Sequence, residues 1–329
     1  MVDAEALREM KMNQQPAVEP LDGAAPSALD GAEPSALECA AACPKPRSSS
    51  EWAAFAGEFL GTFVLVFFGV GVVNAAVVTG AQIGLWQVAV VWSIGVSLGI
   101  YCSATLSGAH INPAITVVAV AYDRFPVLRG LGYIVAQVAG AMAASLLLYG
   151  MFGEAILDFE RRHGLLRGGP GSELSAMVFG EYFPNPAMFG TAEDAWRIVS
   201  MRSAFLGEMI GTAMLAFLIS AVTHPRNSAK PAPAGQALMI GLGVAAIISV
   251  VAPLTQAGLN PARDFGPRVI SWFMGWGTIA FPGPRGGWFT VYILAPIVGG
   301  LIGGGIYRLA GKLLPPTGDE DSADRPGPP

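Results

Sequence analysis

The chain has 329 residues, of which 53% are hydrophobic and 13% charged, with a net charge of −5 at neutral pH. Soluble domains are about a quarter charged, so this composition indicates a membrane protein with several spans rather than a globular core. No basic cluster points to a nucleic-acid partner. The three cysteines form neither a disulfide framework nor a metal-ligand spacing; they are Cys39, Cys43 and Cys102.

Both ends of the chain are polar and of low complexity. Residues 1–50 contain an eight-residue unit that begins at Leu21 and recurs, nearly unchanged, from Leu29. Such tandem repeats with few large apolar residues are typical of disorder. The segment lacks the continuous apolar core of a signal peptide, so we expect it to be retained. We predict disordered cytoplasmic tails at 1–50 and 313–329 around a membrane domain at 51–312.

Six apolar segments lie between the tails. Each approaches the roughly 20 residues that cross a membrane as a helix. Many small residues recur in them at spacings of three and four, which favours close helix packing in lipid. The predicted spans are 53–78, 86–105, 127–150, 203–223, 236–254 and 288–311.

Two further apolar stretches, 113–122 and 261–272, are too short to span a membrane. Each begins with Pro and follows an Asn, the residue types favoured in the first helical turn and at the cap before it. We predict two half-helices that enter the membrane and stop there. Irregular backbone at that depth is tolerated only inside protein or beside a water-filled cavity.

The two halves of the domain match. Glu58 and Glu208 lie 150 positions apart in similar surroundings, and Asn112 and Asn260 lie 148 apart. An odd number of spans in each half inverts the second half, and inverted repeats with broken helices point to a permeation site near the midplane. The predicted fold is an all-α membrane protein with six transmembrane helices, two re-entrant half-helices and an inverted internal repeat, whose halves are 53–150 and 203–311.

The positive-inside rule orients the chain. One set of connections carries six basic residues, whereas the short loop at 79–85 carries no charge. Both termini are then cytoplasmic, and the long connection at 151–202 lies outside. The basic residues are Arg124, Arg129, Arg226, Lys230, Arg308 and Lys312.

We expect Asn112-Pro113-Ala114 and Asn260-Pro261-Ala262 to meet head to head at the centre of a pore. The start of each half-helix would carry about half a positive charge. Asn112 and Asn260 would add amide donors for a hydroxyl or water, and cations and protons would meet a positive barrier. Either motif alone could be an ordinary helix cap. A third motif, Asn185-Pro186-Ala187, has no repeat partner and is interpreted as a turn.

Arg263 is the most conspicuous charged residue in the apolar part of the chain. An Arg at membrane depth usually faces a pore or a partner, and its donor fork can hold two neighbouring hydroxyls. The alternatives are an ion pair with Asp264 or a side chain that reaches the membrane surface. Asp264 itself is interpreted as an anchor for the loop.

Glu58 and Glu208 are predicted to accept backbone N–H groups from the loops that precede the half-helices. The alternative for this symmetric pair is a proton relay. His110 is interpreted as a satisfied loop residue, with a role as a gate as the alternative. No nucleotide-binding loop, metal spacing or catalytic triad is visible, so we expect neither a cofactor nor an enzyme.

Over roughly 52–312 these motifs resemble the major intrinsic protein family, the aquaporins and glycerol facilitators. Asp264 after Asn-Pro-Ala-Arg, and segments such as 157–160 and 182–186 of the long connection, resemble the glycerol-conducting branch. The resemblance implies an aquaporin-like channel domain at 51–312 and a homotetramer with one pore per subunit. It also implies a selectivity filter at four positions, which are Trp92, Ile248, Ala257 and Arg263.

Ala257 departs from the glycerol facilitators, which carry a second aromatic residue at this place. The choice among polyols therefore stays open. The resemblance as a whole implies a passive channel for glycerol, water and other small uncharged solutes, such as urea or undissociated metalloid acids. Its expected location is the plasma membrane, in a bacterium the inner membrane. Ions and protons are expected to be excluded. The alternatives are a water-selective aquaporin, a secondary transporter that uses Glu58 or Glu208 as proton carrier, and a purely structural membrane protein.

Overall fold

The computed structural model describes residues 50–81, 84–281 and 287–313. Within these ranges the chain forms helices and loops and no strand. Six of the helices there are long and apolar enough to cross a membrane. The predicted tails, with Cys39 and Cys43, fall almost wholly outside the described ranges, whereas Cys102 is a free, exposed thiol on a membrane helix.

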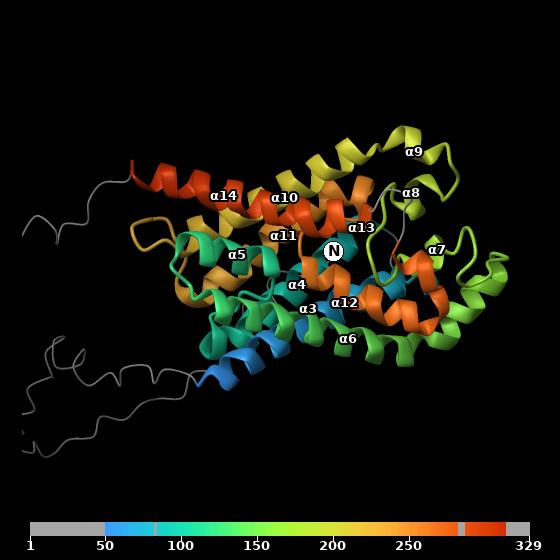
Figure 1. The fold of residues 1–329 in the computed structure, drawn as a ribbon, viewed down its shortest axis with the longest axis horizontal. Helices are drawn as coiled ribbons and strands as arrows, with labels where there is room; N and C mark the ends of the chain where they lie inside the picture. Colours follow the sequence, from blue (N-terminus) through green and yellow to red (C-terminus); the bar gives the residue numbers. More distant parts are fainter. Residues whose placement is uncertain (1–49, 82–83, 282–286, 314–329) are drawn as a thin grey trace, which may run out of the picture. The chain divides into compact units, whose positions relative to one another are not determined.

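The two halves follow the same order of elements (Figure 1). The first half consists of α3 (Glu51–Thr79), α4 (Leu85–Ser107), α5 (Pro113–Tyr122) and α6 (Val127–Arg162). The second consists of α10 (Met201–Thr223), α11 (Pro233–Thr255), α12 (Pro261–Ser271), α13 (Gly287–Phe289), the π-helical turn η3 (Thr290–Leu294) and α14 (Ala295–Gly311).

Short helices occupy the connections. Between the halves lie α7 (Glu173–Ala176), α8 (Pro186–Phe189) and α9 (Ala195–Ile198). After α12 the chain continues through the π-helical turn η1 (Trp272–Trp276) and the 3₁₀ turn η2 (Gly277–Ala280). The predicted six spans and two half-helices are thus confirmed, with two differences in their bounds.

The first difference concerns α6, which was predicted to end at 150 and runs to Arg162. The last helix of the first half therefore extends to Arg162, and the long connection begins at 163 and not at 151. The prediction followed apolarity, but a helix needs only continued backbone hydrogen bonds and can leave the membrane as an amphipathic segment. The cap residue His163 follows the helix and is itself followed by Gly164, whose positive φ of 64° is a conformation that glycine adopts without strain.

The second difference concerns the last span, which was predicted as one continuous helix. The π-helical turn η3 interrupts it before α14. Pro296 lies in the first turn of α14 and has no N–H group to donate to the carbonyl four residues earlier. The hydrogen-bond register widens there, as in the single π turns that occur within α-helices.

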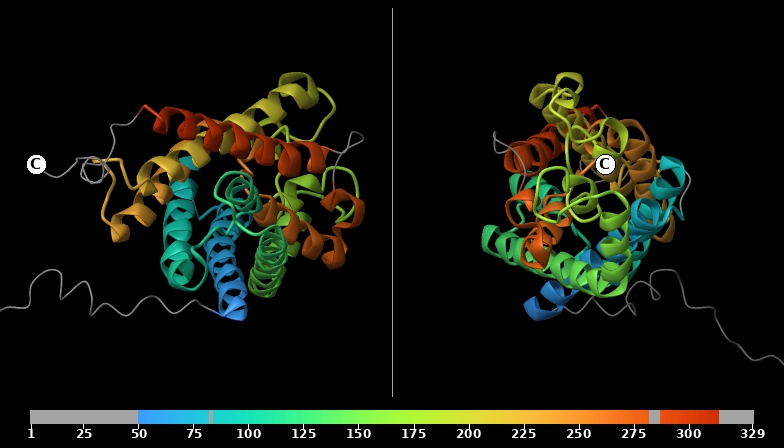
Figure 2. Two further views of the ribbon diagram at one scale, coloured as in Figure 1. Left: turned by 60° about the vertical axis from the view of Figure 1, so that its left-hand side comes forward. Right: turned by 90° about the vertical axis from the view of Figure 1, so that its right-hand side faces the viewer.

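The packing of the helices reveals the inverted repeat. In the first half α3 packs against α4 and α6, and in the second α10 packs against α11 and α14. The halves meet where α4 packs against α11. Each half-helix packs against the last span of the opposite half, so that α12 lies on α6 and α5 lies on α14 (Figure 1; Figure 2).

Equivalent glycines permit the closest helix contacts. Gly140 of α6 faces the backbone carbonyl of Phe59 on α3, and Gly299 of α14 faces that of Met209 on α10. Gly303, one turn further along α14, faces the carbonyl of Ala213 in the same way. A Cβ atom at any of these positions would collide with backbone, so the small residues determine how closely the helices approach.

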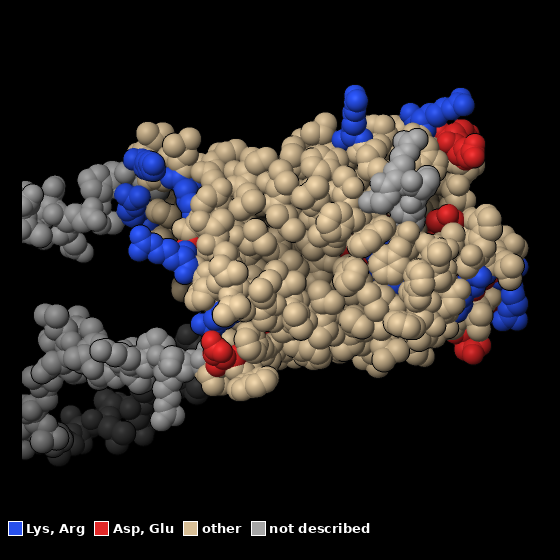
Figure 3. Space-filling model, in the orientation of Figure 1, with Lys and Arg blue, Asp and Glu red and all other residues tan. Residues whose placement is uncertain are grey.

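Charged residues concentrate at the two ends of the face in Figure 3, with a mainly uncharged band between them. Two contacts bring the predicted cytoplasmic connections together. Arg308 on α14 forms an ion pair with Asp123 after α5, and Arg226 donates to the carbonyl of Gly311 at 2.9 Å. The basic residues used for the orientation therefore lie on connections that share one end.

Gly303→Val should destabilise the protein, because the added side chain pushes α14 away from the Ala213 carbonyl. Overpacking of this kind costs about 1–3 kcal/mol. The melting temperature of the detergent-solubilised protein, followed by tryptophan fluorescence, measures it. Gly150→Ala in α6 is the control, because a Cβ there meets no atom within 4 Å. A Gly303→Val melting temperature equal to that of the control would contradict this account of the packing.

Candidate functional site

The half-helices begin as their Asn-Pro sequences predict. The Asn112 side-chain oxygen accepts the N–H of Ala114 at 2.8 Å. The Asn260 side-chain oxygen accepts the N–H groups of Ala262 at 3.0 Å and Arg263 at 3.3 Å. Each Asn therefore caps its own helix with its oxygen, which leaves the amide nitrogen available for another partner.

That partner lies in the opposite half. Asn112 Nδ2 donates to the carbonyl of Leu259 at 3.0 Å, and Asn260 Nδ2 donates to the carbonyl of Ile111 at 2.8 Å. The two motifs therefore meet head to head through a reciprocal pair of hydrogen bonds. An amide nitrogen carries two protons, so each Asn keeps one further N–H. Both side chains line the same cavity.

Glu58 and Glu208 hold the loops that lead into the half-helices. Glu58, on α3, accepts the N–H groups of His110 at 2.9 Å and Ile111 at 2.7 Å. Glu208, at the equivalent place on α10, accepts those of Gly258 at 2.9 Å and Leu259 at 2.8 Å. Both carboxylates are fully buried, and the four N–H groups that they accept belong to loop residues outside the helices.

These loops carry a strained backbone. Positive φ angles occur at Ala109 (57°) and Ile111 (42°) in the first loop, and at Gln256 (65°), Ala257 (60°) and Leu259 (55°) in the second. Each such residue costs about 1–3 kcal/mol and persists only where its surroundings hold it. The carboxylates supply that support and keep irregular backbone beside the cavity.

His110 is held on several sides. Its ring nitrogen Nδ1 lies 3.2 Å from the hydroxyl of Thr116, and its ring packs against Phe125 and Tyr133 with centroids 4.9 and 5.1 Å apart. Gln137 of α6 donates to Glu58 at 2.7 Å. These contacts fit the interpretation of His110 as a satisfied loop residue and of Glu58 as a support for the loop.

A cavity of about 660 Å³ passes between the halves. All four residues of the predicted filter, and both Asn of the paired motifs, line it. So do segments 108–112 and 257–260 of the two loops. Apolar side chains of the membrane helices line it as well, and they include Leu65, Val96, Ile100, Leu215, Ile240 and Val244. The cavity thus combines polar loop backbone with hydrocarbon side chains.

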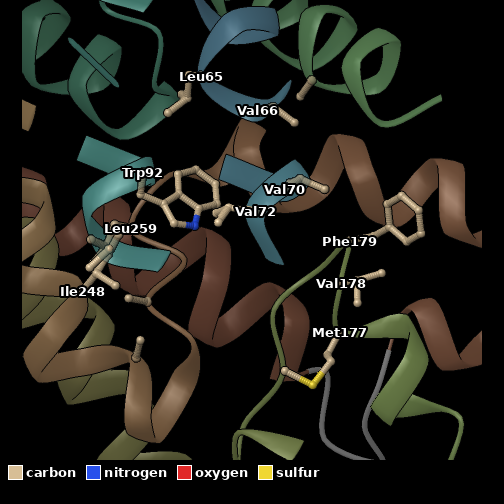
Figure 4. Packing of buried hydrophobic residues seen from close by; sticks show 14 of the residues in the cluster. Leu65, Val66, Val70, Val72, Trp92, Met177, Val178, Phe179, Ile248 and Leu259 are labelled. Atoms are coloured by element: carbon tan, nitrogen blue, oxygen red, sulfur yellow. The ribbon is translucent and has the colours of Figure 1, made fainter. Parts of the chain in front are cut away.

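Arg263 and Trp92 meet at one end of the cavity. The guanidinium carbon of Arg263 lies 4.3 Å from the centroid of the Trp92 ring. Gly69 of α3 provides the space for that ring, because a Cβ there would collide with it. Figure 4 shows Trp92 among buried hydrophobic residues of one cluster, which include Val72, Ile248 and Leu259. Both Trp92 and Arg263 are only 5% exposed.

The structure contradicts the alternative in which Arg263 forms an ion pair with Asp264. Asp264 instead accepts from Arg268 at 2.7 Å and from the N–H of Glu181 at 2.8 Å, which fits its interpretation as an anchor. Arg263 forms its ion pair with Glu181, in the long connection, and donates to the carbonyl of Phe179 at 3.4 Å. The pairing of neighbours in the sequence failed because α12 turns their side chains in different directions.

Sequence reasoning missed Glu181 and Phe179 as filter neighbours. A signal for them was present, because Glu181 is a single acid within the mainly apolar run 177–183 of an otherwise polar connection. The role of the Gln256 side chain was also missed. Its side chain accepts the N–H of Tyr182 at 2.8 Å and donates to the carbonyl of Met177 at 3.2 Å, and so fastens the same run to the end of α11.

The third Asn-Pro-Ala motif has a local role. Asn185 caps the short α8 by accepting the N–H of Ala187 at 3.0 Å and donates to the carbonyl of Ala252 at 2.8 Å. The interpretation as a turn therefore extends to one short helix tied to α11. In the described part of the chain no group of three or more His, Cys, Asp or Glu is arranged to hold a metal ion.

An inverted repeat of membrane helices with two half-helices that meet beside a large cavity is the architecture of a membrane channel. The profile of the family described as Major intrinsic protein matches residues 45–307, and the chain belongs to this family.

Similar proteins of known name agree with this assignment. The glycerol uptake facilitator protein of Escherichia coli K12 is 42% identical over 78% of this chain and 88% of its own length. The propanediol uptake facilitator PduF of Citrobacter freundii is 42% identical over 78% of this chain and 92% of its own. The X-ray structure of the aquaglyceroporin from Plasmodium falciparum superposes with a TM-score of 0.68 at 27% identity, covering 80% of this chain and 99% of that one.

Glu208→Gln should lower the melting temperature, because the amide NH₂ replaces one oxygen that accepts backbone N–H groups. An unsatisfied buried donor costs about 1–3 kcal/mol. Thermal unfolding in detergent measures the loss, and Glu154→Gln, at an exposed position of α6, is the control. An unchanged melting temperature would remove the supporting role from Glu208.

Proposed function

We propose that the protein is a passive channel for glycerol and related small uncharged polyols, with water as a second permeant. The observation that carries this proposal is the mixed lining of the cavity, which combines polar loop backbone and Arg263 with apolar side chains. A polyol carries hydroxyl groups along one edge and C–H groups along the other, and so matches both kinds of lining. The names of the bacterial relatives support the same solute class.

Each filter residue has a proposed role. Trp92 and Ile248 contact the carbon chain, while Arg263 and the loop carbonyls bind hydroxyl groups and water. Ala257 has only a methyl group at the cavity wall, which leaves space for solutes with bulk beyond glycerol. The similarity to propanediol uptake facilitators supports a range of short polyols, and urea and undissociated metalloid acids fit the same class.

Exclusion of ions and protons is proposed for the centre of the channel. There the remaining amide protons of Asn112 and Asn260, together with the N-terminal ends of both half-helices, donate to the permeating molecule. A water that accepts from both Asn residues points its own protons away from the centre. Cations meet the positive ends of two helix dipoles.

The proposed setting is the plasma membrane, in a bacterium the inner membrane, with both termini in the cytoplasm. The basic connections that share one end support this orientation. A homotetramer with one pore per subunit is proposed from the family resemblance. Large apolar side chains exposed on the helices, such as Leu98 and Val250, fit contact with lipid or a neighbouring subunit. Native mass spectrometry from lipid nanodiscs tests the assembly, and a monomer would contradict it.

Stopped-flow light scattering on proteoliposomes should record glycerol influx well above that of empty liposomes, with no dependence on a proton gradient. A rate no faster than in empty liposomes would contradict the glycerol channel, and fast water flux alone would indicate a water-selective aquaporin. Accumulation against a glycerol gradient, driven by protons, would instead support a coupled transporter.

Arg263→Ala should increase the leak of small cations through the channel, because a positive charge is removed from the passage while glycerol flux persists. Ion leak into proteoliposomes, followed with a potential-sensitive dye, provides the measurement. Arg197→Ala, at an exposed position in the long connection, is the matched control. Unchanged ion leak in a folded Arg263→Ala protein would remove Arg263 from the filter.

A further inference from the structure

Among the residues that the structure describes, the carboxylate of Glu181 has one partner. Glu181 lies in the long connection, outside the membrane helices, and is only 1% exposed. Its side chain forms an ion pair with Arg263. Apart from that pair, neither carboxylate oxygen meets a hydrogen-bond donor from the residues that the structure describes. Because Arg263 is its one partner among the described residues, the Glu181 carboxylate acts mainly on the position of the Arg263 guanidinium.

The backbone around Glu181 is held by other groups. Asp264 accepts its N–H at 2.8 Å, and Arg268 donates to its carbonyl. Gln256 accepts the next N–H, that of Tyr182, at 2.8 Å. Gly180 lets the chain pass directly over the Arg268 side chain, where a Cβ would collide. The path of this segment therefore does not depend on the Glu181 side chain.

Arg263 has two attractions that pull in different directions. On one side lie Glu181 and the carbonyl of Phe179, both in the long connection, and on the other lies the face of the Trp92 ring. A buried guanidinium without a counter-charge is costly. Loss of the carboxylate would leave only the long hydrogen bond to the Phe179 carbonyl, at 3.4 Å, on the outer side, so the Trp92 ring and water in the passage would draw the guanidinium toward the solute path.

We propose that Glu181 is a positioning residue of the filter, whose carboxylate draws the Arg263 guanidinium toward the outer connection and so sets the width and the net charge of the passage beside Trp92. This inference rests on the proposed channel function. With Glu181 ionised, the pair is neutral and the passage is open to uncharged solutes. With Glu181 neutral, Arg263 is released and narrows the passage.

The surroundings of Glu181 place this change within an accessible pH range. Burial raises the pKa of Glu181 to about 8, against the lowering effect of Arg263 and Arg268. Asp264 on α12 and Glu208 on α10 add to the increase, and the side chains of Tyr182 and Tyr292 lie in the same surroundings. Because the pKa is raised, the carboxylate exists above about pH 8 and is lost as the pH falls below it.

The test measures glycerol and water permeability of proteoliposomes at pH 6 and pH 9 for the wild type, Glu181→Gln and the matched control Glu193→Gln. Glu193 is exposed in the same connection. We expect the wild type and the control to conduct glycerol several-fold faster at pH 9 than at pH 6. Glu181→Gln should stay at the slow wild-type rate at both pH values, and at pH 6, where the wild-type carboxyl is also neutral, its melting temperature should match that of the wild type.

A Glu181→Gln protein that follows the wild-type pH profile would overturn the proposal, as would a wild type whose fluxes do not change with pH. Should Glu181→Gln fail to fold, Glu181→Asp carries the test. Its shorter carboxylate should give slower flux at pH 9 and keep a pH response, and a wild-type rate there would overturn the proposal. Absence of glycerol flux in the wild type would contradict the channel function separately, and the water permeability would still report on Glu181.

Discussion

The structure depends on the need to satisfy irregular backbone within a membrane. A passage lined by carbonyl groups requires peptide segments outside helices, and lipid offers their N–H groups no partner. Glu58 and Glu208 meet this need from equivalent places, each with two backbone hydrogen bonds. The left-handed residues of both loops, the direction of the half-helices and the crossing of the two Asn side chains all follow from loops held in this way.

Side chains also hold irregular backbone in place beside the filter. Asp264 and Arg268 lie on α12 yet bind the backbone of the long connection, so the half-helix that carries Arg263 also holds the segment that balances its charge. Arg167, in the long connection, also links this connection to the rest of the wall. Its guanidinium pairs with Glu160 of α6 at 2.9 Å and lies over the Trp276 ring. The outer connection is thus a fitted part of the channel wall.

Much of this could be predicted from the sequence because membrane helices are encoded locally. Apolar length gave the six spans, and Asn-Pro at the start of two short apolar runs gave the half-helices. Helix continuation to Arg162 and the π turn before Pro296 depend on hydrogen bonds that apolarity does not report. The partner of Arg263 lies 82 positions away at Glu181, in a connection without periodicity, so only the folded chain could reveal it.

The exchange of half-helices between the two halves has a consequence for how the chain is made. The half-helix α5 packs against α14, the last helix in the described part of the chain. Leu259, whose carbonyl accepts from Asn112, is synthesised before α14, but until α14 emerges the first half-helix lacks this helix partner. The wall beside α5 is therefore incomplete until α14 has been made, and a chain truncated before α14 lacks a complete channel although five of the six described spans are present.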